Sequence, residues 1–155
     1  MFNSCYLLAS VVISNSITSI DKFTFYKCHT LGSIVIPNSV TSIGDSAFSN
    51  CHSLTSIVIP DSVTSIGSST FNECHSLTSI AIPGGVMSIG SSTFLECYGI
   101  RYYDFTKHTA VPALANTNAF KGIPADCEIR VPAALYDEWI AATNWANYTS
   151  NIVAV

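Results

Sequence analysis

The sequence predicts a repeat solenoid of the α/β type, mostly β, with a parallel β-sheet on one face and a C-terminal cap that contains one helix. Three observations predict this fold. A pattern of 23 residues recurs in phase along the chain, each copy contains an alternating apolar segment such as Ile-Val-Ile, and the pattern decays before a helical segment near the C-terminus. A unit this short cannot bury its apolar stripe alone, so neighbouring units must stack.

The repeat is established by direct superposition of the sequence on itself. Residues 31–53 and 54–76 are identical at 17 of 23 positions, and residues 54–76 and 77–99 at 16 of 23. The repeats span 8–30, 31–53, 54–76 and 77–99, with a partial repeat at 1–7 and a degenerate one from 100. We therefore assign residues 1–105 to the repeats and residues 106–155 to a capping segment.

Each column of the repeat has a physical interpretation. The alternating isoleucines form a strand with one face buried, and the proline after them ends it by removing a donor from the ladder. We expect the glycine column to take a positive φ, and the phenylalanine column to fill the core from a short turn or helical segment. In one repeat these columns are Ile57, Ile59, Pro60, Gly67, Phe71 and Cys74.

The pattern LxxIxIPxxVxxIGxxxFxxC, over roughly residues 2–105, resembles the BspA-like (Treponema-type) leucine-rich repeats. The resemblance implies a solenoid with a parallel sheet on one face. It also implies a bacterial cell-surface or secreted protein, in which such repeats act in adhesion or host contact.

Composition excludes two classes of partner. Only 10% of the residues are charged, the net charge is −4 and the pI is near 5.3, so the chain lacks the basic face that nucleic acid requires. No apolar run approaches the roughly 18 residues of a membrane span, so we expect no membrane insertion.

The C-terminal segment predicts a cap. Residues 127–132 alternate as a strand, residues 132–145 have helical periodicity, and residues 151–155 are typical of a short final strand. A terminal repeat needs a cap because its core and strand edge would otherwise be exposed. The alternative is a separate carbohydrate-binding module that uses Trp139, Trp145 and Tyr148.

The N-terminal end shows no comparable cap. We expect either that the chain is a piece of a longer array or that this open edge pairs with a second copy as an edge-to-edge homodimer.

Two columns raise the question of chemistry at the recurring Cys-His pair. The cysteines at 5, 28, 51, 74 and 97 favour a ladder of free, buried thiols, with disulfides between rungs as the alternative and Cys127 outside the column. The adjacent column holds His29, His52 and His75, then Tyr98. We expect these side chains to face solvent, without carboxylates at ligand spacing, so no metal site, cofactor or thiol catalysis is predicted, and the chain is interpreted as a non-enzyme.

The remaining candidate is the outward face of the sheet. Most of its positions carry small uncharged residues: Ser33, Val35, Ser56, Val58, Ser79 and Ala81. In the fifth rung the same columns hold Arg101, Tyr102 and Asp104, which are typical contact residues. We expect a ligand there first, with contact to the cap as the alternative.

The sequence thus predicts a protein-binding or adhesion module, with an unidentified extracellular or host protein or glycan as its partner. The alternative is a structural spacer that sets length and rigidity without binding a ligand itself.

Overall fold

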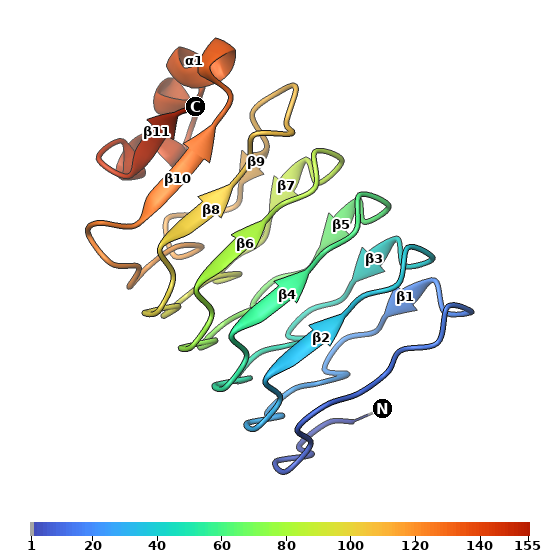
Figure 1. Cartoon of the computed structure of the whole chain (residues 1–155). Coiled ribbons are helices and arrows are strands. Elements are labelled where there is room, and N and C mark those ends of the chain that lie inside the picture. The colour runs from blue at the N-terminus through green and yellow to red at the C-terminus, as the bar shows by residue number, and fades with distance from the viewer. Residues whose placement is uncertain (1) are drawn as a thin grey trace.

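The computed structural model describes residues 2–155, which wind into a parallel β-solenoid with a short helix at its C-terminal end (Figure 1). The turns of the solenoid are here called rungs, and each rung after the first contributes a strand to a main sheet. The main sheet comprises two hydrogen-bonded groups of strands, the first with β2 (Ser33–Val35) and β4 (Ser56–Val58), and the second with β6 (Ser79–Ala81), β8 (Tyr102–Asp104), β10 (Glu128–Val131) and β11 (Ile152–Ala154). All of its paired strands are parallel, and Thr78 N donates to Thr55 O across β4 and β6 at 3.3 Å.

A second series of two-residue strands runs along another side of the solenoid. It contains β1 (Ser19–Ile20), β3 (Ser42–Ile43), β5 (Ser65–Ile66), β7 (Ser88–Ile89) and β9 (Ala113–Leu114). The Ser-Ile pairs therefore form parallel ladders of their own, β1-β3-β5 and β7-β9, in the second of which Ala113–Leu114 takes the place of a Ser-Ile pair. The sequence predicts a single parallel sheet, so this second series of strands is a finding of the structure.

The core sits between the two series of strands and consists of the predicted columns. Ile57, Ile59 and Phe71 are buried, as are their equivalents in the neighbouring rungs. The phenylalanine rings stack from rung to rung, with Phe48 and Phe71 centroids 5.6 Å apart and nearly parallel. The column reaches the cap, because Phe120 stacks on Phe94 at 5.2 Å. Phe120 therefore continues the phenylalanine column into the cap.

The glycine column exists for a different reason from the one predicted. Gly44, Gly67 and Gly90 do not have positive φ. Instead, a Cβ on Gly67 would lie 2.5 Å from the backbone nitrogen of Asp45 in the previous rung, so the column allows close approach of successive backbones. Left-handed φ occurs in two other columns: Phe23, Ser46, Ser69, Ser92, and Ser4, Lys27, Asn50, Glu73, Glu96.

The cysteine column lies inside the solenoid as free thiols, and Cys5 is its only half-buried member. Each thiol from Cys28 to Cys97 in this column donates to a phenylalanine carbonyl 26 residues earlier, as from Cys74 to Phe48 at 3.3 Å. Cys127 is also a buried free thiol.

The cap is built from the predicted strands and a shorter helix than predicted. A 3₁₀ turn, Ala133–Leu135, leads into α1 (Tyr136–Ala141), and a second 3₁₀ turn covers Trp145–Tyr148. The α-helix stops early because Ala142 is extended, with ψ 146°, and Asn144 has φ 66°. β11 pairs with β10 and closes the main sheet.

The aromatic residues of the cap fill the end of the core. Trp139 and Trp145 have no exposed area and Tyr148 is 9% exposed. The Trp145 indole donates to Pro112 O at 2.7 Å, and the Tyr148 hydroxyl donates to Thr117 O. The alternative of a carbohydrate-binding module that presents these three rings is therefore wrong, because they face inward.

The first rung is less regular than its neighbours. Residues 7–14 form no strand, although Leu8, Val11 and Ile13 are half-buried against the core at the predicted inward positions. The outward positions are open, with Leu7 89% and Val12 97% exposed.

Candidate binding surface

The outward face of the main sheet presents two parallel rows of side chains, because the strands stack in register. One row runs through Ser33 and Ser56 and continues with Ser79, Tyr102 and Glu128. The other runs through Val35 and Val58 and continues with Ala81, Asp104, Arg130 and Val153. Both rows change from small uncharged residues to large polar ones between β6 and β8.

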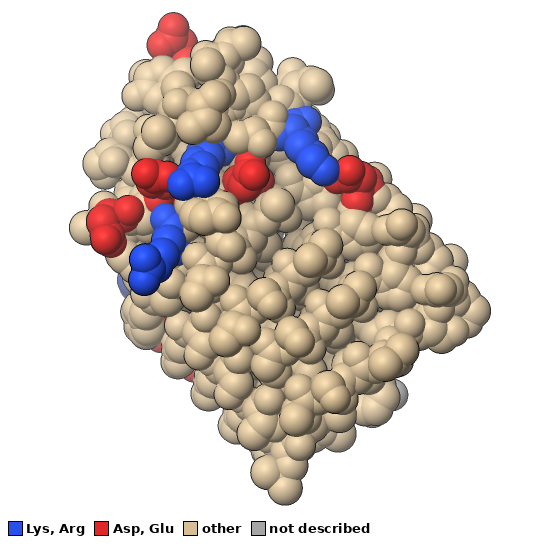
Figure 2. Space-filling view, viewed as in Figure 1, with Lys and Arg blue, Asp and Glu red and all other residues tan. Residues whose placement is uncertain are grey.

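The N-terminal half of this face is plain. Ser33, Ser56 and Ala81 are exposed and Ser79 is half-buried, while Val35 and Val58 are 72% and 65% exposed. Figure 2 shows this half as an uncharged surface, with charged side chains gathered toward β8 and the cap. The predicted residues of this half offer a flat apolar strip but no charge.

The C-terminal half brings Arg101, Tyr102 and Asp104 together with residues of the cap. The guanidinium of Arg130 covers the Tyr102 ring, with its Cζ 3.9 Å from the ring centroid. Arg130 Nε also donates to Glu128 Oε2 at 2.8 Å, which orients the guanidinium. Tyr102 therefore meets the cap on one side, which is the alternative that the sequence left open.

Asp104 and Arg101 differ in their availability to a ligand. One carboxylate oxygen of Asp104 accepts from the backbone N and the Oγ1 of Thr106, at 2.9 and 2.6 Å, so Asp104 serves partly to shape its own loop. Arg101 is exposed, and across residues 2–155 its side chain has no hydrogen-bond or ion-pair partner. Of the three predicted residues, Arg101 is the one whose charge is free.

A hollow of about 610 Å³ opens beside these residues, between β8 and the loop that leads to β10. It is lined by Tyr98, Gly99, Ile100, Arg101, Tyr102, Pro124, Asp126, Glu128 and Arg130. The hollow arises because the connection from β8 to β10 is longer than the regular repeat, with Tyr102 paired to Glu128 rather than to a residue 23 positions on.

Sequence reasoning missed Glu128 and Arg130, although a signal for them was present. The segment 127–132 alternates, and the structure buries Ile129 and Val131 on its inward face. The same alternation puts Glu128 and Arg130 outward, in register with Tyr102 and Asp104. No comparable sequence signal marks Asp126 or Tyr98, because only the loop between β8 and β10 brings these two residues to the same hollow.

The hollow suits a polar ligand with a flat or extended face. Tyr102 and Tyr98 offer aromatic surface, Arg101 and Arg130 offer guanidinium donors, and Asp126 adds a carboxylate. Such a mixture of aromatic and charged groups is typical of contact surfaces for peptides and sugars.

The Cys-His pairs do not assemble a nucleophile and its base. Cys51 is fully buried, whereas the neighbouring His52 is half-buried on the outer side. Burial, with a smaller effect of the Cys28 thiol, raises the pKa of Cys51 to about 12. The same cause raises the pKa of Cys97 to about 12, so these thiols are held protonated rather than activated.

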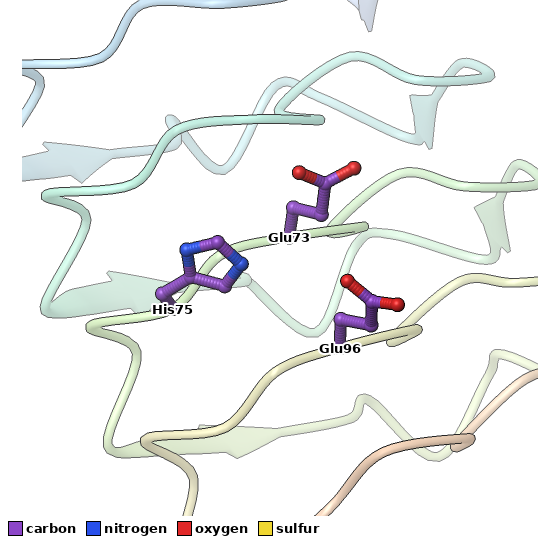
Figure 3. A group of neighbouring side chains, drawn as sticks. All are labelled: Glu73, His75 and Glu96. Atoms are coloured by element: carbon purple, nitrogen blue, oxygen red, sulfur yellow. The ribbon is translucent and has the colours of Figure 1, made fainter.

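The histidine column is more ordered than a solvated surface column. His29 and His52 stack at 4.7 Å, His52 and His75 at 4.8 Å, and His75 and Tyr98 at 5.3 Å. The expectation that no carboxylates lie at ligand spacing is wrong for one rung. Ligand atoms of Glu73, His75 and Glu96 all lie within 4.8 Å of one another (Figure 3).

Within residues 2–155, no helix has both the length and the apolar character needed to cross a membrane. The helix of the cap is six residues long.

The comparisons with known proteins agree with this architecture. The model of the BspA type leucine rich repeat region matches residues 1–124 in six copies, so the match extends beyond residue 105 into the segment assigned to the cap. Among curated proteins, none matches this sequence.

Three solved structures are similar to the chain. A leucine rich repeat protein of T. pallidum is 30% identical, with a TM-score of 0.72 over 79% of this chain and 57% of that one. A leucine rich cell surface protein of Faecalibacterium prausnitzii is 26% identical, with a TM-score of 0.70 over 95% and 36%. A leucine-rich repeat protein of Bacteroides ovatus is 25% identical, with a TM-score of 0.64 over 86% and 42%.

The chain therefore spans less than two thirds of the length of each of these proteins. The family model covers most of the chain, and the solenoid with its main parallel sheet is the fold that the sequence predicted. The chain belongs to the BspA-type leucine-rich repeat family.

Proposed function

We propose that the chain is a non-catalytic binding or adhesion module of a bacterial surface or secreted protein. Its contact surface is the hollow beside β8 and β10, and its partner is an extracellular or host protein or glycan. One observation carries the proposal: the charged residues Arg101, Asp126, Glu128 and Arg130 all line this hollow, while the strands β2, β4 and β6 carry no charged residue. Figure 2 shows charged side chains gathered toward this end of the face.

The chemistry of the hollow supports this assignment. Arg101 is exposed and unpaired among residues 2–155, so its guanidinium is available to a carboxylate or a sugar hydroxyl. Tyr102 and Arg130 are already stacked, which leaves little conformational entropy to lose when a ligand binds. The surface setting is supported by the F. prausnitzii relative, which is named a leucine rich cell surface protein.

A second candidate is a structural spacer, favoured by the uniform stacking of the N-terminal rungs. The phenylalanine column repeats at nearly constant separation, and Val35 and Val58 present the same small surface in successive rungs. In this role the repeats set a distance, and another part of a longer protein makes the contact.

The two candidates are separated by a binding screen. Chain freed of its purification tag is tested against an array of extracellular-matrix proteins and an array of host glycans, alongside the Arg101→Ala variant. A binding module gives saturable binding to at least one ligand, weakened about tenfold or more by Arg101→Ala. An intact, folded chain that binds nothing on either array supports the spacer and overturns the proposal.

A further inference from the structure

Two columns of polar side chains run next to each other where each rung turns toward the main sheet. One is the left-handed column of Lys27, Asn50, Glu73 and Glu96, and the other is the stacked column of His29, His52, His75 and Tyr98. The left-handed residues are fixed by hydrogen bonds between rungs, such as Glu73 N to Leu95 O at 2.8 Å. The backbone therefore fixes the position from which each of these side chains projects.

Only one histidine has a carboxylate both in its own rung and in the next. His29 has Lys27 and Asn50 at these positions, whereas His75 has Glu73 and Glu96. Ligand atoms of Glu73, His75 and Glu96 lie within 4.8 Å of one another, and Figure 3 shows a ring nitrogen of His75 facing the space between the two carboxylates.

The orientation of His75 is fixed before any ligand binds. Its ring is sandwiched between His52, at 4.8 Å and 9°, and Tyr98, at 5.3 Å and 19°. Its Nε2 is buried and has no hydrogen-bond partner within residues 2–155. A buried imidazole nitrogen without a hydrogen-bond partner, next to two carboxylates, forms a group of potential ligand atoms whose bonding capacity is not used within the protein.

The charges point to a cation as the missing partner. Among the described residues, neither Glu73 nor Glu96 forms an ion pair with a lysine or arginine, and the nearest ionic contact is His52 Nε2 to Glu73 Oε2 at 3.9 Å. Two adjacent carboxylates without a cation repel each other. A divalent ion would neutralise both and would also satisfy the imidazole nitrogen.

We propose that Glu73, His75 and Glu96 bind a divalent transition-metal ion, with Zn²⁺ as the ion whose ligand preferences they fit. One imidazole nitrogen and two carboxylate oxygens provide three ligands and leave a fourth position open to water or to a group from a partner. Tetrahedral zinc bonds of about 2.1 Å place ligand atoms about 3.4 Å apart. The glutamates reach that separation by rotating their terminal torsions, because His75 is held by the stack.

The experiment measures Zn²⁺ binding by calorimetry to tag-free protein that has been treated with a chelator and dialysed. We expect one equivalent to bind, and we expect Glu96→Gln and His75→Gln each to weaken binding at least tenfold. His29→Gln is the matched control, since it removes an imidazole from the same column at a place where Lys27 and Asn50 occupy the positions of the two glutamates, and it should leave binding unchanged. The melting temperature without metal verifies that each variant is folded, and Glu96→Gln keeps the test valid if His75→Gln does not fold.

Three results would overturn the proposal. The first is no Zn²⁺ binding by the folded protein. The second is equal weakening by His29→Gln and His75→Gln, which would mean that the imidazole stack binds metal without the carboxylates. The third is a strong thiolate-to-metal charge-transfer band when Co²⁺ replaces Zn²⁺, which would place the metal on cysteine.

Discussion

The thiol of Cys51 donates a hydrogen bond to the backbone carbonyl of Phe25, at 3.2 Å, in the preceding rung. The same bond recurs from Cys74 to Phe48 and from Cys97 to Phe71. The cysteine column thus links successive rungs. Each of these carbonyls also accepts a hydrogen bond from the backbone nitrogen three residues on, such as Cys28 N to Phe25 O at 3.1 Å, so the thiol adds a second hydrogen bond that joins one rung to the next.

The thiols should be unreactive until the protein unfolds. Burial raises the pKa of Cys51, Cys97 and Cys127 to about 12, so almost no thiolate is present at neutral pH. In native protein we expect a thiol reagent to modify at most Cys5, which is half-buried. After denaturation without reductant all six cysteines should react, as counted by mass spectrometry. Fewer than six labels would show that some of them are bridged.

Substitution of Gly67 by alanine should destabilise the solenoid. The new Cβ would meet the backbone nitrogen of Asp45 at 2.5 Å, which neither rung can relieve without separating. We expect a loss of about 1–3 kcal/mol in the free energy of unfolding, measured by urea denaturation. Gly32→Ala is the matched control, since nothing lies within 4 Å of the added Cβ. An equal loss in both variants would mean that close approach of the rungs is not the reason for the column.

The protein should lose stability as the pH falls below about 6.5. Burial lowers the pKa of His108 below its ordinary value of 6.5, against smaller opposite effects of its hydrogen bonds to the Val86 and Phe105 carbonyls. In the interval between the folded pKa and 6.5 the unfolded chain binds more protons than the folded one. The free energy of unfolding therefore decreases as the pH falls, by up to about 1.4 kcal/mol per pH unit for this group.

This acid sensitivity is measured by urea denaturation between pH 5 and 8. His52 contributes in the same direction, because burial, followed by the neighbouring His75 and His29, lowers its pKa. Its side chain is 38% exposed, so its share is smaller. His108→Gln should reduce the slope, and an unchanged slope would rule out His108 as its source.

The chain is expected to self-associate through its first rung. Leu7 and Val12 are 89% and 97% exposed next to a segment that forms no strand, which leaves apolar surface and backbone groups for a second copy. Light scattering over a range of concentrations should detect a dimer that Val12→Lys disrupts. Val58→Lys, at an exposed position away from this edge, should not disrupt it. A monomer at every concentration contradicts the expectation.

The sequence predicts the core of this fold well because each core column recurs. Phe71 and Cys74 are identifiable as inward residues from their spacing alone, and the structure buries both. The role of Gly67 could not be found in the same way, because a short distance to the next rung and a positive φ both select glycine. Only the stacking of the rungs in the structure shows that close approach, rather than a positive φ, selects glycine at this position.

The candidate surface was predictable only in part, because it combines two segments. Arg101 and Tyr102 stand out as departures from the repeat, but the Arg130 guanidinium over the Tyr102 ring depends on how β10 adds to β8. The Glu73, His75 and Glu96 group was missed for a related reason. Its two carboxylates are 23 positions apart, and only the stacking of rungs brings them to one histidine.

The central claim is that the chain binds its partner at the hollow beside Arg101 rather than along the plain half of the sheet. The most direct test is the dissociation constant of a ligand found by screening, measured for Arg101→Ala and for Val35→Ala, since both side chains are exposed. We predict that Arg101→Ala raises the dissociation constant at least tenfold and that Val35→Ala changes it less than twofold. A larger effect of Val35→Ala than of Arg101→Ala would contradict the claim and place the contact on the uncharged rungs.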